Sequence, residues 1–214
     1  MYINMEETLD TKDWRRLQVA GNEMLKDMLE YLEKIRSKPV WQQPSQSVID
    51  FFNMPLPTKS TPLNKIYDDL KNQIIPYTSG NKHPRFWGWV MGNGTPVGVL
   101  AEMIAAALNI NMVGGFHSGS LVERQVLNWL KELIGFSNES SGVLVSGASM
   151  ANFIGLSVAL NSKANFDIGK VGLQSSENKY CFYASKETHN SIEKAVKLLG
   201  IGTDYLRLID VNRK

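Results

Sequence analysis

Two short loops in the last third of the sequence carry residues that suit the binding of a phosphate-bearing ligand. The first loop, residues 146–152, follows the apolar run 142–145, and the second, residues 185–191 with His189, follows the run 179–184. A helix is expected after each loop, and the free N–H groups at a helix start favour an anion. If both runs are strands of one parallel sheet, both loops lie at its carboxyl edge, where ligands bind in α/β sheets.

The first loop has the composition expected of a phosphate site. Gly147 and Ala148 leave the backbone uncovered, so that a phosphate can approach closely, and Ser149 adds a hydroxyl donor at the helix start. The alternative is a helix start whose small residues bind no ligand. The sequence of this loop alone does not distinguish that alternative from a phosphate site.

The second loop precedes a helix whose ends are marked in the sequence. Asn190 with Glu193 three residues later resembles a capping box, and Gly200 is expected to end the helix. His189 is thus placed at the carboxyl end of a strand. Taken alone, a histidine beside a helix start is more often a capping or solvated residue than a ligand contact.

Four segments together resemble the pyridoxal-phosphate-dependent group II amino-acid decarboxylases, the family of aromatic-amino-acid, glutamate and histidine decarboxylases. Their order and spacing follow the N-terminal half of that family across nearly the whole chain. The matching segments are residues 83–88, 122–130, 142–152 and 189–195.

The resemblance implies an α/β fold of the aminotransferase-like type, fold type I, with pyridoxal 5'-phosphate as the cofactor. It also implies that Gly147, Ala148 and Ser149 bind the cofactor phosphate. His189 would stack its imidazole on the pyridine ring and act as a catalytic residue.

Phe86 and Trp87 are the substrate-binding candidates, because the corresponding region lines the substrate pocket in the resembled family. The alternative is that these rings are simply part of the core. His117 also lies in a Gly-rich loop that could reach the site, with weaker support. The three histidines stand far apart in sequence, so no metal site is expected.

Pyridoxal chemistry also needs a lysine that holds the cofactor as a Schiff base. In the resembled family that lysine lies beyond the His189 motif, and Lys186 and Lys194 are expected to be solvated charges. The sequence therefore predicts the N-terminal part of a carboxy-lyase, inactive alone. Another fold-type-I enzyme, a lyase or an aminotransferase, and a catalytically silent dimerising fragment are the alternatives.

Two departures from the family pattern leave the substrate open. Met150 follows the phosphate-loop serine where many aromatic-amino-acid decarboxylases have glutamate, and residues 118–120 read Ser-Gly-Ser in place of Ser-Pro-Ala. An L-amino acid is expected as substrate, and an aromatic one is one option.

Composition is that of an ordinary globular protein of one or two domains. The 214 residues are 43% hydrophobic and carry a formal net charge of +2, so no nucleic-acid partner is expected. The single Cys181 excludes an internal disulfide framework and is expected in the core. No stretch approaches the roughly 20 apolar residues of a membrane span, and a cytoplasmic protein is expected.

The chain divides into an N-terminal helical segment, residues 1–79, and the first, incomplete part of a cofactor-binding large domain, residues 80–214. A helix capped by Asp10 or Thr11 is expected to run to about Ile35. Residues 39–62, with five prolines, are expected to be extended, and the alternative for residues 42–47 is a flexible linker. A further helix is expected to begin with Thr61 as its cap and Pro62 in its first turn. In the resembled family such helices pack around a second subunit, so a homodimer is expected.

The large domain is expected to alternate helices with parallel strands. Thr95 and Pro96 should open one helix, and Ser120 with Glu123 is interpreted as the capping box of another that stops at Gly135. Residues 205–211 are predicted to form a third strand. This alternation favours a mainly parallel sheet.

Overall fold

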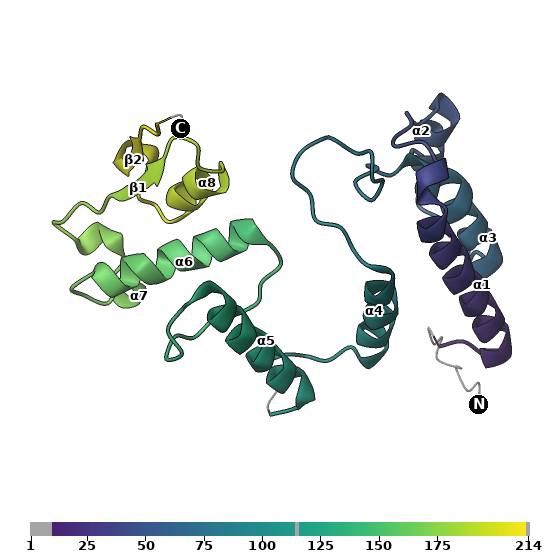
Figure 1. The fold of residues 1–214 in the computed structure, drawn as a ribbon, viewed down its shortest axis with the longest axis horizontal. Coiled ribbons are helices and arrows are strands. Elements are labelled where there is room, and N and C mark those ends of the chain that lie inside the picture. Colours follow the sequence, from purple (N-terminus) through teal and green to yellow (C-terminus); the bar gives the residue numbers. More distant parts are fainter. Residues whose placement is uncertain (1–9, 114–115, 213–214) are drawn as a thin grey trace, which may run out of the picture. The chain divides into compact units, whose positions relative to one another are not determined.

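The computed structural model describes residues 10–113 and 116–212 (Figure 1). The chain forms two compact units, Met1–Ile110 and Asn111–Lys214. Within the described residues, no helix combines the length and the apolar character that a bilayer crossing requires.

The first unit begins with the long helix α1 (Trp14–Glu33), followed by a 3-10 turn, Ile35–Ser37. Asp13 caps this helix, because its carboxylate accepts the Arg16 backbone N–H at 2.9 Å. The prediction of Asp10 or Thr11 as the cap was wrong. The Thr11 hydroxyl instead accepts the backbone N–H of Asp13 at 3.2 Å, and so supports the capping residue.

Helix α2 (Gln46–Phe52) lies within the segment that was predicted to be extended. The prolines of this segment flank residues 45–54, which contain none, so seven residues coil between Pro44 and Pro55. Val48 is the buried residue of this helix. The extended prediction was therefore wrong for α2.

Helix α3 (Leu63–Asp69) passes without a break into a π-helical turn, Leu70–Ile74, and a 3-10 turn, Ile75–Tyr77. Pro62 is its N-cap residue and makes no side-chain capping bond, so the predicted cap at Thr61 was wrong.

Helices α1 and α3 lie side by side (Figure 1) and are joined by a polar contact. The Tyr67 hydroxyl donates to the Asp27 carboxylate at 2.8 Å, and the Tyr67 residue is only 7% exposed. The Lys71 ammonium lies 4.5 Å from the centre of the Tyr67 ring and 3.6 Å from the Glu23 carboxylate.

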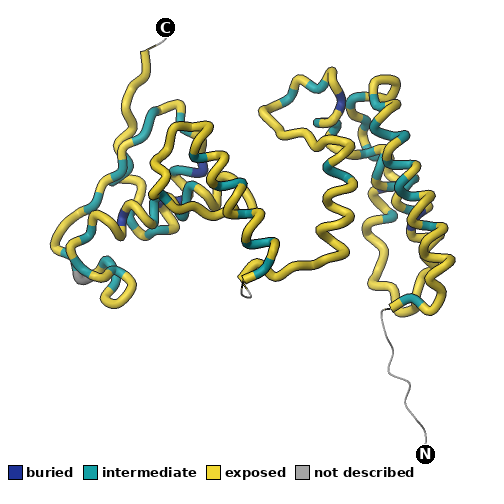
Figure 2. The backbone as a smooth tube through the Cα atoms, turned by 60° about the horizontal axis from the view of Figure 1, so that its bottom comes forward, coloured by how far each residue is buried: buried dark blue, intermediate teal, exposed yellow. Residues whose placement is uncertain are grey.

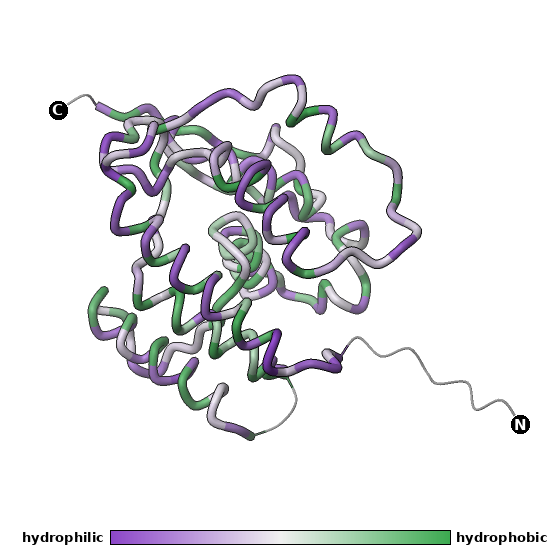
Figure 3. Tube along the Cα trace, turned by 90° about the vertical axis from the view of Figure 1, so that its right-hand side faces the viewer, coloured by the Kyte–Doolittle hydropathy of each residue, from purple (hydrophilic) through white to green (hydrophobic). Residues whose placement is uncertain are grey.

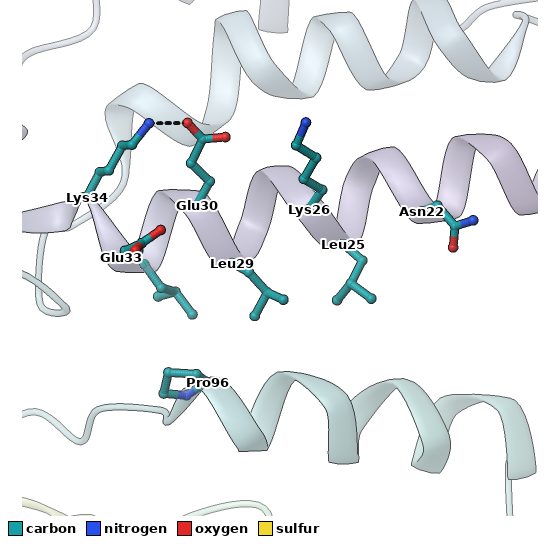
Figure 4. Close-up of a pocket in the computed structure, with 9 residues that line it drawn as sticks. Asn22, Leu25, Lys26, Leu29, Glu30, Glu33, Lys34 and Pro96 are labelled. Carbon is teal, nitrogen blue, oxygen red and sulfur yellow. Dashed lines mark hydrogen bonds and ion pairs between the residues drawn. The ribbon is translucent and has the colours of Figure 1, made fainter.

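Helix α4 (Pro96–Leu108) begins as predicted, with the Thr95 hydroxyl accepting the Gly98 N–H at 3.0 Å. A groove of about 760 Å³ lies between α1 and the start of α4. Figure 4 shows Leu25 and Leu29 of α1 pointing toward Pro96, whereas Glu30 of α1 points to the other side. Apolar side chains of α1 thus face α4.

The second unit contains α5 (Ser118–Ile134), α6 (Ala148–Lys163), the short α7 (Ile168–Val171) and α8 (Ser191–Leu198). Helix α5 stops at Gly135 as predicted, since Gly135 adopts φ +69°, which glycine reaches without strain. Its start was predicted wrongly: Ser120 lies in the first turn and donates to the His117 carbonyl at 2.7 Å. Glu123 accepts the Leu144 N–H at 3.0 Å instead of capping.

Two strands, β1 (Phe182–Ser185) and β2 (Leu206–Ile209), pair in parallel, with Phe182 opposite Leu206. They confirm the prediction that strands of this region pair in parallel. The prediction of a strand at residues 142–145 was wrong. In the described part of the chain only β1 and β2 pair, and residues 142–145 belong to no helix or strand. Val143 and Leu144 are 57% and 52% exposed rather than buried.

Burial is sparse in both units (Figure 2). Cys181 is exposed, because it lies just before β1, so its predicted place in the core was wrong. Figure 3 shows hydrophobic residues along the helices, and many of them are exposed. The buried apolar residues among those described are Val48, Tyr67, Leu160, Ala195 and Val196.

Candidate cofactor site

The start of α6 presents unpaired N–H groups on an open surface. The N–H groups of Met150 and Ala151 both donate to the Gly147 carbonyl at 3.1 Å. The preceding N–H groups, of Ala148 and Ser149, have no earlier helical carbonyl to reach. All of these residues are exposed, and a Cβ placed on Gly147 would meet nothing within 4 Å. A ligand can therefore approach the backbone directly.

The electrostatics of this helix start favour an anion. Helix α6 has 16 residues, so its aligned peptide dipoles place partial positive charge at the Ala148 end. Its first turn contains no acidic residue that would neutralise that charge. Met150, in the same turn, is uncharged.

His189 lies between β1 and α8 and caps that helix with its ring. Its Nδ1 accepts the Ser191 backbone N–H at 3.2 Å and lies 2.9 Å from the Ser191 hydroxyl. The predicted capping box was therefore wrong: Asn190 makes no side-chain capping bond, and Glu193 pairs with Lys197 at 2.6 Å. The predicted helix end was confirmed, since Gly200 adopts φ +74° just beyond α8.

A side-chain bond joins the two predicted loops. The Asn152 amide, one turn beyond Ser149 on α6, donates to the Ser191 hydroxyl at 2.8 Å. Ser191 is 2% exposed, where α6 and α8 pack against each other. The tertiary structure thus brings the α6 start and the His189 loop to one side of the second unit.

Comparison with known proteins identifies the family of this chain. The family model described as the pyridoxal-dependent decarboxylase conserved domain matches residues 44–214. The chain belongs to the pyridoxal-dependent decarboxylase family. It is 27% identical to an aromatic-L-amino-acid decarboxylase of Bacillus atrophaeus, over 90% of this chain and 38% of that protein. It is also 27% identical to tyrosine decarboxylase 2 of Narcissus pseudonarcissus, over 97% of this chain and 42% of that protein.

Solved structures confirm the fold expected for this decarboxylase family. The glutamate decarboxylase domain of a Vibrio parahaemolyticus enzyme superposes with a TM-score of 0.80 at 23% identity, covering 95% of this chain and 46% of that one. A 4-hydroxyphenylacetaldehyde synthase of Rhodiola rosea superposes with a TM-score of 0.76 at 20% identity, covering 95% and 44%. The chain spans about two fifths of the length of the curated relatives it matches.

The aromatic substrate candidates of this family member lie in the first unit. Trp87 is 93% exposed and Phe86 is half-buried, so the alternative that both rings are core is wrong for Trp87. The Asn81 amide donates to the Gly92 carbonyl at 3.3 Å and so links the two ends of the loop that carries them. A substrate-binding role for Phe86 and Trp87 stays a prediction.

The remaining candidates take structural roles. His117 precedes α5, and its Nε2 lies 3.0 Å from the Asn111 carbonyl oxygen. Lys186 pairs with Asp210 at 2.5 Å, and Lys194 is exposed, as expected of solvated charges. In the described ranges, no three His, Cys, Asp or Glu side chains cluster as metal ligands would.

Sequence reasoning did not single out two residues that join the two loops of this candidate site, Asn152 and Ser191. Both fall inside segments that resemble the family, but neither residue type at these positions signals chemistry. The available signal is spacing: Asn152 follows Ser149 by three residues, and so shares its helix face. Which partner Asn152 meets depends on the packing of α6 against α8.

Proposed function

We propose that this chain provides the phosphate-binding and ring-stacking residues for pyridoxal 5'-phosphate in an enzyme that decarboxylates an L-amino acid. The observation that carries this proposal is the Asn152–Ser191 hydrogen bond. It links the helix with the free N–H groups of Ala148 and Ser149 to the loop that holds His189.

The residues present fit this cofactor. A phosphate would receive the two backbone N–H groups and the Ser149 hydroxyl, at a helix start without an opposing carboxylate. Gly147 adds no side chain that would block the approach. The exposed His189 imidazole, anchored through Nδ1, offers a flat face to an aromatic ring.

When bound, the cofactor provides an electron sink for the pair of electrons left by the departing carboxylate. The residues of this chain would bind the cofactor and orient it and the substrate. Ser149 and its helix start would fix the phosphate, His189 would keep the ring in its plane, and Phe86 and Trp87 would contact the substrate side chain. Binding energy at the phosphate thereby restricts the reacting groups to one geometry.

The substrate is proposed from the relatives. The proteins of similar sequence include decarboxylases named for tyrosine and tryptophan, and a phenylacetaldehyde synthase of Petunia hybrida at 27% identity. An aromatic L-amino acid is therefore the first substrate to test. The product has to be identified as well, as an amine or as an aldehyde.

A homodimer and a cytoplasmic location are part of the proposal. Helix α4 is apolar on nearly all sides, yet Met103, Ile104 and Leu108 are each more than half exposed. An apolar surface of this kind requires a covering partner, and a second copy that packs on residues 1–79 and on α4 would supply one. A single, exposed thiol at Cys181 suits a reducing compartment.

The test uses the complete protein loaded with pyridoxal 5'-phosphate. It is given L-tyrosine, L-tryptophan, L-phenylalanine and L-glutamate in turn, and carbon dioxide, amine and aldehyde are measured. We expect carbon dioxide and amine in equal amounts from at least one aromatic substrate. The proposal would be overturned if the protein lost all of its cofactor on dialysis. It would also be overturned if the protein transferred the amino group of the substrate and released no carbon dioxide. Sedimentation of the same sample tests the dimer.

A further inference from the structure

We infer that Asn152 and Ser191 are positioning residues, which hold the His189 imidazole in the tautomer with its hydrogen on Nε2. The geometry of this arrangement stands by itself, whereas its consequence for catalysis rests on the proposed function. Asn152 lies on α6, Ser191 is the first residue of α8, and His189 precedes α8 by two residues.

The backbone contributes to the state of Nδ1. A peptide N–H can only donate, and the Ser191 N–H lies 3.2 Å from Nδ1 of His189. Nδ1 offers its lone pair to this N–H and then carries no hydrogen. At 3.2 Å the bond is at the long end of the usual range, so a second donor is needed to hold the ring in this state. In a neutral imidazole the hydrogen then sits on the other nitrogen, Nε2.

The Ser191 hydroxyl supports the same state. Its oxygen accepts an N–H of the Asn152 amide at 2.8 Å, which leaves the hydroxyl hydrogen to point at Nδ1, 2.9 Å away. The donor direction thus runs from Asn152 to Ser191 to His189. Because Ser191 is 2% exposed, water does not compete for this hydroxyl.

The arrangement couples the two halves of the proposed cofactor site. Ser149 and Asn152 are separated by three residues on α6 and lie on one face of that helix. The helix proposed to fix the phosphate therefore also orients the imidazole proposed to stack on the ring. The fixed tautomer leaves Nε2–H as the single donor of the neutral ring.

The discriminating measurement is the tautomer of His189 in the complete protein without cofactor. Histidine is labelled with ¹⁵N, and long-range ¹H–¹⁵N correlation spectra distinguish protonated from unprotonated ring nitrogens. The His189→Ala variant identifies the His189 signals. We expect Nε2 protonated and Nδ1 unprotonated in the parent protein.

Three variants test the roles of the two side chains. Ser191→Ala removes the hydroxyl, and Asn152→Asp replaces the amide donor with a near-isosteric carboxylate that accepts the Ser191 hydroxyl hydrogen. Both are expected to mix the two tautomers of His189. Asn161→Asp is the matched control, because Asn161 is exposed on the same helix and its amide donates to the Ser157 carbonyl at 2.9 Å. The control is expected to leave the His189 signals unchanged.

In the loaded enzyme, Ser191→Ala and Asn152→Asp are expected to lower kcat about three- to tenfold, the effect of one hydrogen bond, with KM nearly unchanged. Ser191→Thr, which keeps a hydroxyl, should restore most of the loss. If Ser191→Ala does not fold, Asn152→Asp decides alone.

Parent-like His189 signals in both Ser191→Ala and Asn152→Asp would overturn the inference and reduce the pair to a clamp between α6 and α8. Failure of the parent protein to bind pyridoxal phosphate would overturn the proposed function instead. That failure would leave the tautomer result standing, so the two proposals fail separately.

Discussion

Removal of the Tyr67 hydroxyl measures how strongly α1 and α3 are held together. Tyr67→Phe deletes the donor to Asp27 but keeps the ring, its burial and its position 4.5 Å from the Lys71 ammonium. The substitution thus isolates one hydrogen bond between two helices. Because that bond ends on a carboxylate, it is stronger than a bond between neutral groups.

The magnitude follows from burial and charge. A hydrogen bond to a charged group contributes about 1.5–3 kcal/mol, and Asp27 is about one-third exposed, so water replaces part of what the carboxylate loses. We therefore expect Tyr67→Phe to lower the free energy of unfolding by about 1–2 kcal/mol at pH 8.

Alkaline pH provides a second test. Burial, and then the hydrogen bond to Asp27, raise the pKa of Tyr67 to about 12 from 10.0. Between these values the unfolded phenol loses its proton while the folded phenol keeps it, so the unfolded state binds fewer protons and stability falls as pH rises. A difference of two in pKa corresponds to about 2.7 kcal/mol of folding stability. This stability is fully present below pH 10 and is lost by pH 12.

The assay is urea unfolding of the complete protein, parent and variant, at several pH values from 8 to 12. The stability advantage of the parent should shrink above pH 10 and change sign near pH 12, because the parent loses about 2.7 kcal/mol there and the phenylalanine has no proton to lose. Tyr183→Phe is the control, because Tyr183 is largely exposed on β1. An equal effect of both substitutions, or a difference that stays constant up to pH 12, would refute the reasoning.

Three further predictions concern the candidate site and the helix ends. Ser149→Asp should weaken cofactor affinity at least about tenfold by like-charge repulsion while the fold persists, measured by titration of the apo-protein; unchanged affinity would remove Ser149 from the site. His189→Ala should lower turnover by roughly 2 kcal/mol of transition-state stabilisation or more, with little change in thermal stability, and near-normal turnover would contradict its role. Gly135→Ala should destabilise by about 1 kcal/mol or more in urea unfolding, because φ is +69° there, whereas Gly21→Ala inside α1 should stabilise.

Local signals in the sequence determined several elements correctly. Thr95 and Pro96 open α4, and Gly135 and Gly200 follow α5 and α8. These signals depend on the conformation of one or two residues and on short-range hydrogen bonds, so they do not require knowledge of the rest of the fold. The same holds for the small residues at Gly147 and Ala148, which predicted an accessible helix start.

The sequence failed where several residues competed for one role. Asp13 caps α1 although Asp10 and Thr11 are equally suitable types, and His189 rather than Asn190 caps α8. The choice among neighbouring polar residues depends on backbone angles one or two residues apart, which composition does not encode. The strand predicted at residues 142–145 failed for a different reason, because a strand exists only where another strand pairs with it.

The residue types for a cofactor site were thus readable from the sequence, whereas their assembly was not. The motifs around Ser149 and His189 each follow a local pattern. Only the packing of α6 against α8 places Asn152 within 2.8 Å of Ser191 and so fixes the direction of the hydrogen bonds that end at His189. A contact between residues 39 positions apart depends on how two helices pack, and no local periodicity specifies that packing.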